Sequence, residues 1–137
     1  MIWKPPRRLV QVALALGGLM DAWVALLALF VPGALGPLLD IPSHDPNWTV
    51  FAGCEFAVVA VLYGAILRDL ERFRPLMLVV AFDQFLAGFV PLLLISHGQL
   101  LGSWKTIAPL PVNFALWVIL AHAGVRKSAP AESQTAK

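Results

Sequence analysis

The sequence predicts an all-α integral membrane protein, an up-down bundle of four transmembrane helices with both termini in the cytoplasm. Its composition points to a membrane: hydrophobic residues make up 59% of the 137 residues and charged residues only 13%, whereas soluble domains carry about 25% charged residues. The apolar residues gather in four runs, each close to the roughly 20 residues that a helix needs to cross a bilayer. The Lys and Arg residues fall almost entirely on one side of these runs, which predicts the orientation.

The four predicted spans lie in one domain, residues 1–127, and cover residues 9–31, 48–67, 76–95 and 107–124. These runs are too long, and too rich in Leu and Ala, to be strands. The first connection is expected to be a loop, because helix-breaking residues recur in it: Pro32, Gly33, Gly36, Pro37, Pro42 and Pro46. Residues 128–137 are small and polar, and we expect them to form a disordered cytoplasmic tail.

The positive residues precede the first span, separate the second from the third, and follow the fourth: Lys4, Arg7, Arg8, Arg68, Arg72, Arg74, Arg126, Lys127 and Lys137. Lys105 alone lies on the other side. Loops rich in Lys and Arg stay in the cytoplasm. This asymmetry therefore places both termini there, and we expect the protein in a bacterial inner membrane, in contact with membrane lipid.

Charge and cysteine content argue against several classes of function. A net charge of +2 gives no reason to expect nucleic-acid binding. The single cysteine, Cys54, can form neither an internal disulfide nor a CxxC redox pair. Asp40, His44 and Asp45 lie together in the first connection, but their spacing is not a recognised metal-ligand spacing. We therefore expect no metal and no cofactor.

Three acidic residues lie inside the predicted spans: Asp21, Glu55 and Asp83. Such a group in hydrocarbon costs about 2.5–3.5 kcal/mol on insertion scales and marks a functional hypothesis. With a rise of about 1.5 Å per residue, Asp21, Glu55 and the amide Asn113 lie at one level in the outer half of the membrane. Asp83 lies closer to the cytoplasm. We predict a ligand pocket that opens outward on Asp21, Glu55 and Asn113, with the ring of Trp117 beside them and Asp83 as a secondary member.

Several functions fit this pattern. The leading interpretation is a non-enzymatic protein that binds a small hydrophobic or amphipathic molecule, or that serves as a subunit of a membrane assembly, including a homo-oligomer. The enzyme alternative is an intramembrane isomerase with Glu55 as proton donor and Asp21 as acceptor. A proton-coupled small transporter that uses Asp83 is the third. The acids can also be purely structural, because protonated acids and amides hydrogen-bond across helices for about 1 kcal/mol each.

Three stretches carry a resemblance to a known group: ALGGLMDAW in the first span, DPNW before the part of the second span that holds Glu55, and FDQFLAGF followed by ISHG in the third. In these stretches the chain resembles small bacterial four-helix membrane proteins of the BphX-like and DoxX-like group, over about residues 9–124. The resemblance implies the fold and a membrane location but no activity. The run DPNWTVFAGCE and Pro91 also resemble the sterol-isomerase and sigma-2-receptor type of four-helix domain, whose ligand pocket opens within the membrane.

Overall fold

The computed structural model describes residues 3–40 and 46–125. These residues form helices and turns with no strand, and four helical segments are long and apolar enough to cross a membrane. The predicted all-α class is therefore confirmed, and the chain is compatible with a multi-pass membrane protein. His44, Asp45 and the predicted tail at residues 128–137 lie outside the described residues.

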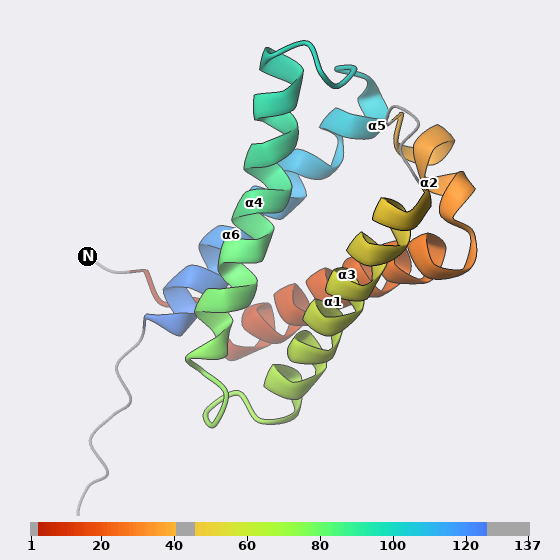
Figure 1. The fold of residues 1–137 in the computed structure, drawn as a ribbon. Helices are drawn as coiled ribbons and strands as arrows, with labels where there is room; N and C mark the ends of the chain where they lie inside the picture. Colours follow the sequence, from red (N-terminus) through yellow and green to blue (C-terminus); the bar gives the residue numbers. More distant parts are fainter. Residues whose placement is uncertain (1–2, 41–45, 126–137) are drawn as a thin grey trace, which may run out of the picture.

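The four long segments agree with the predicted spans to within a few residues. Helix α1 covers Arg7–Phe30, α3 covers Pro46–Arg68, α4 covers Leu76–Ser96 and α6 covers Pro109–Gly124 (Figure 1). The fourth candidate membrane span also includes the short helix α5, Trp104–Ile107, so it begins three residues before the predicted residue 107.

The first connection was predicted to be a loop, and this prediction is wrong over residues 32–39. Helix α2 covers Pro32–Leu39. Pro32 occupies the first turn of α2, where its missing N–H leaves no hydrogen bond unmade and its fixed φ favours a helix. The helix ends at Asp40, which adopts a left-handed conformation with φ 52°. The first proline of this connection therefore starts a helix instead of preventing one.

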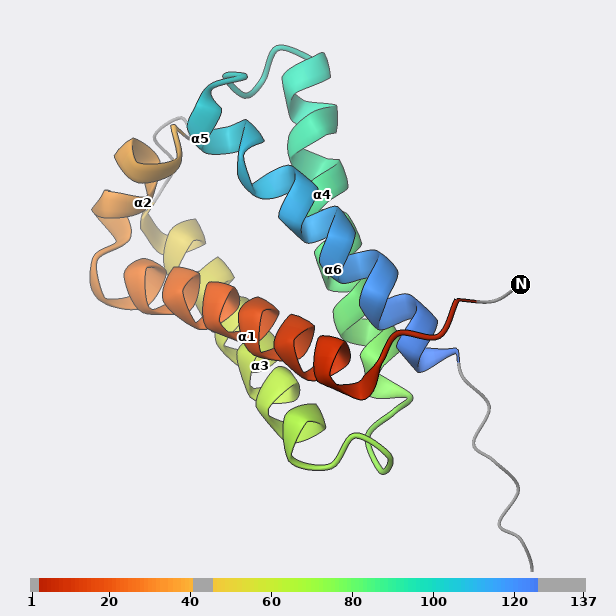
Figure 2. The same ribbon diagram turned by 180° about the vertical axis from the view of Figure 1, so that it is seen from behind.

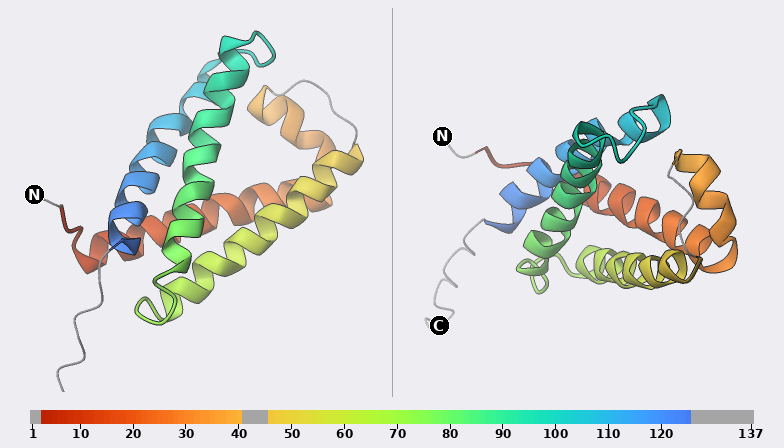
Figure 3. Two further views of the ribbon diagram at one scale, coloured as in Figure 1. Left: turned by 60° about the vertical axis from the view of Figure 1, so that its left-hand side comes forward. Right: turned by 45° about the horizontal axis from the view of Figure 1, so that its top comes forward.

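The long helices form two pairs that diverge from each other. Helix α1 runs along α3, and α4 runs along α6. The pairs meet at one end, where α1 begins and α6 ends, and they separate toward the other end, where α2 and α5 lie (Figure 2). The two views in Figure 3 show the same divergence. We call these the closed end and the open end.

The buried core lies toward the closed end, where side chains of all four long helices meet. Tyr63 of α3 is fully buried there, and its hydroxyl donates a hydrogen bond to the Val80 carbonyl of α4 at 3.3 Å. Its ring lies against Gly17 of α1, where an added Cβ would come within 2.8 Å of ring atoms. Only glycine permits this approach, so Tyr63 contacts both helix pairs at the point where they meet.

Candidate functional site

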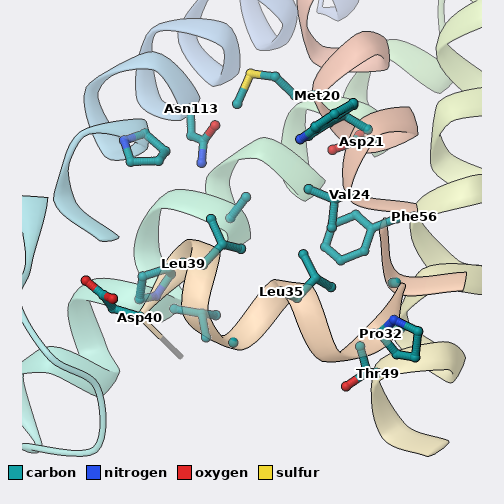
Figure 4. Close-up of a pocket in the computed structure, with 18 of the residues that line it drawn as sticks. Met20, Asp21, Val24, Pro32, Leu35, Leu39, Asp40, Thr49, Phe56 and Asn113 are labelled. Carbon is teal, nitrogen blue, oxygen red and sulfur yellow. The ribbon is translucent and has the colours of Figure 1, made fainter. Parts of the chain in front are cut away.

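The divergence of the helix pairs leaves a cavity of about 1250 Å³ near the open end. Helices α1 and α3 form one wall, α4 and α6 form the other, and α2 lies across it (Figure 4). Most of its surface is apolar, with Val24, Leu35 and Phe56 on one side and Leu86 and Val90 on the other. Pockets for small molecules commonly measure about 300–1,000 Å³ and are mostly apolar, so this cavity is large enough to hold one.

Three buried polar side chains line the cavity: Asp21 of α1, Gln84 of α4 and Asn113 of α6. Their exposed fractions are 5%, 1% and 6%. Among the described residues, nothing donates a hydrogen bond to Asp21 Oδ2, Gln84 Oε1 or Asn113 Oδ1. Figure 4 shows Asp21 and Asn113 on opposite sides of the cavity. An unsatisfied buried polar group costs about 1–3 kcal/mol, and a molecule in the cavity could supply the missing partners.

The structure brings together two of the three residues predicted at the base of a pocket, Asp21 and Asn113. Glu55 is exposed on α3 and is not part of the cavity wall. The reason is the rotation of α3 about its axis. Gly53 faces α1. Glu55 follows two residues later, and at 3.6 residues per turn its side chain points about 160° away from the direction of Gly53. Gln84 of α4 supplies the third polar group.

Trp117 and Asp83 are not part of the cavity wall. Trp117 is half-buried, and its ring centroid lies 5.1 Å from that of Phe85. Asp83 is half-buried beside the Gln84 amide and close enough to Asp21 for an electrostatic interaction. Its Oδ2 atom is buried without a hydrogen-bond partner in the described chain. The ligand-binding roles of these residues stay predictions.

A polar contact at the open end was not predicted from the sequence. Lys105 Nζ donates hydrogen bonds to the Pro37 carbonyl at 2.9 Å and to Asp40 Oδ1 at 3.1 Å. The Ser103 hydroxyl and the Lys105 ammonium lower the pKa of Asp40 below its ordinary value. The two hydrogen bonds of Lys105 tie α2 to α5 across the open end. Lys105 and Asp40 are 65 residues apart in sequence, so the only sequence signal was that Lys105 stood apart from the Lys and Arg residues predicted to be cytoplasmic.

Among the described residues, no group of three or more His, Cys, Asp and Glu side chains is placed to hold a metal ion. No protein-family model, curated protein or solved structure matches the chain. The chemistry of the cavity is therefore the main guide to function.

Proposed function

We propose that this chain binds a small, mostly apolar molecule in the cavity between its helix pairs, through hydrogen bonds to Asp21, Gln84 and Asn113. One observation carries the proposal. Three buried polar side chains, each with an oxygen that lacks a partner, come from three different helices to the wall of one largely apolar cavity. Purely structural hydrogen bonding would pair these oxygens with donors on neighbouring helices, and among the described residues none of the three is so paired.

The unpartnered atoms limit the chemistry of the ligand. All three are oxygens, and the amide oxygens of Gln84 and Asn113 only accept hydrogen bonds. The terminal torsions of Asp, Asn and Gln are soft, so small rotations can turn these oxygens into the cavity. A molecule with an apolar body and an ammonium group, which carries three N–H donors, could satisfy all three oxygens, whereas a hydroxyl group carries one donor and could satisfy one of them. A pure hydrocarbon would leave them without partners.

We further propose that the closed end faces the cytoplasm of a bacterial inner membrane. Five arginines lie at this end: Arg7, Arg8, Arg68, Arg72 and Arg74. The positive-inside preference favours this side for the cytoplasm. The cavity then lies in the outer half of the membrane, where an amphipathic molecule can reach it from the lipid.

The isomerase alternative requires Glu55 and Asp21 to face one substrate. Glu55 lies on the exposed side of α3, outside the cavity wall, so the geometry favours binding over this chemistry. The proximity of Asp83 to Asp21 is the one observation that favours a proton-coupled transporter. That function would also require the bound molecule to cross the closed end, which the shared core fills.

Three probes that share one apolar body test the proposal: 1-adamantylamine, 1-adamantanol and 1-methoxyadamantane. The ether accepts hydrogen bonds but cannot donate them. Native mass spectrometry of the protein in one detergent measures the bound fraction of each probe. We expect the amine and the alcohol to bind more tightly than the ether by about 5- to 150-fold, which corresponds to the cost of an unmet buried hydrogen bond.

The variant Asn113→Leu keeps the side-chain size and removes the amide. It should reduce the preference for the alcohol over the ether, while Asp21 and Gln84 remain as acceptors. Thr49→Val is the matched control, because Thr49 lines the same cavity but has no buried oxygen without a partner. Equal binding of the alcohol and the ether to the wild type, or an unchanged preference in Asn113→Leu, would refute the proposal.

A further inference from the structure

The outward-facing side of α3 combines apolar residues with an acid. Phe51, Cys54, Glu55, Val58 and Val61 are all exposed along it, and we call them the α3 outer face. Phe51, Val58 and Val61 are 58%, 62% and 71% exposed. Figure 1 shows α3 in front, with no other described helix over this side. The apolar members suit lipid, but Glu55 does not.

Glu55 lies deep within the membrane-crossing part of α3. With a rise of about 1.5 Å per residue, it is about 13 Å from the start of the helix at Pro46 and about 20 Å from its end at Arg68. A carboxyl group at this depth is costly unless it is paired, and such groups seldom face lipid. The described Lys and Arg side chains belong to helix ends and connections: Lys4, Arg7, Arg8, Arg68, Arg72, Arg74 and Lys105. None of them is placed to pair with Glu55 within one copy of the chain.

We infer that the α3 outer face is an interface between two copies of this chain, in which the two Glu55 carboxyl groups hydrogen-bond to each other. All copies enter the membrane in the same orientation, so a two-fold axis along the membrane normal sets α3 against α3 in parallel and in register. In such an isologous contact each residue near the axis meets its own counterpart.

The chemistry of Glu55 makes this face self-complementary. A protonated carboxyl group carries both a donor and an acceptor, so two of them satisfy each other without a cation. A different protein would need its own polar group at the same depth, and lipid tails would offer none. Cys54 is small and adjoins Glu55, so it lets the backbones approach closely at this level. The interface is independent of whether the cavity binds a ligand.

The single cysteine of the chain supplies the test. A disulfide requires the two Cα atoms to come within about 4.4–6.8 Å, so a Cys54–Cys54 bond reports close approach beside Glu55. We would oxidise native membranes that contain the wild type with copper–phenanthroline and measure the dimer on non-reducing gels. The control Cys54→Ser/Leu19→Cys moves the thiol to α1, where Leu19 is 69% exposed on a face without an acid.

We expect a cross-linked species of twice the chain mass for the wild type and only background for the Leu19→Cys control. Glu55→Gln keeps a donor and an acceptor and should keep the cross-link. Glu55→Leu should weaken association by about fivefold, the effect of about one interhelical hydrogen bond, with unchanged helix content by circular dichroism. Wild-type cross-linking no higher than the control, equal cross-linking in Glu55→Leu, or an adduct of any other mass would overturn the inference.

Discussion

Replacement of Gly53 by alanine tests how closely α1 and α3 pack. Gly53 is buried, and a Cβ at this position would lie 2.7 Å from Ala28 Cβ and 3.1 Å from Leu29 Cγ. Favourable carbon–carbon contacts need about 3.5–4.0 Å. The Ala28 Cβ is bonded directly to the backbone, so no side-chain rotation can relieve the clash. The two helices would have to separate by about 0.8 Å or more to restore an ordinary contact.

Gly64 of the same helix supplies the matched control, because an added Cβ there meets nothing within 4 Å. Both substitutions gain the higher helix propensity of alanine, which is worth up to about 1 kcal/mol. The difference between them isolates the cost of overpacking, typically about 1–3 kcal/mol. We therefore expect Gly53→Ala to have a free energy of unfolding about 1–3 kcal/mol below that of Gly64→Ala.

The assay is equilibrium unfolding of both variants in mixed micelles by titration with dodecyl sulfate, followed by circular dichroism. Retention of the wild-type helix content before the transition would show that the Gly53→Ala variant folds. Equal free energies of unfolding for the two variants would mean that α1 and α3 are not in the close contact described above, and the packing argument would fail.

Two further contacts make separate predictions. Asp40→Asn should lower the Tm more at pH 7 than at pH 3. The folded-state pKa of Asp40 lies below its ordinary value of 3.8, so its stabilisation is fully present above that value and declines as the pH falls toward and through the folded pKa. An equal loss of Tm at both pH values would contradict this. Tyr63→Ala should cost about 3–5 kcal/mol because the ring is fully buried. Tyr63→Phe should lower the free energy of unfolding by only about 0.5–1.5 kcal/mol, because it removes one hydrogen bond of 3.3 Å to the Val80 carbonyl. Both variants are measured by the same unfolding titration. Similar losses for the two variants would refute the packing role of the ring.

The long helices could be predicted from the sequence because the thickness of the bilayer sets their length. An uninterrupted apolar run of that length in lipid has to satisfy its backbone hydrogen bonds within itself, which makes it helical. The connection after α1 could not be predicted in this way. A proline is as compatible with the first turn of a helix as with a loop. A helix forms if the backbone N–H groups of the following residues donate hydrogen bonds to carbonyls one turn earlier, as in α2, which begins at Pro32.

The candidate site was predictable in part. Asp21 shares a face of α1 with small residues such as Gly17, and that face is buried, so its inward direction followed from the pattern. Helix α3 was predicted to present Glu55 to the pocket. The structure packs the Gly53 face against α1, because the small residue allows closer contact, and this turns Glu55 outward.

The sequence by itself determined the number and lengths of the helices that are long and apolar enough to cross a membrane, because these depend on local hydrophobicity and on the dimensions of the bilayer. The tertiary structure alone decided how each helix is rotated about its axis and where the pairs diverge. Both depend on contacts between residues far apart in the chain, such as Gly53 with Ala28 and Gly17 with Tyr63. The cavity is a consequence of that divergence, and its third polar residue, Gln84, was therefore identified only in the folded chain.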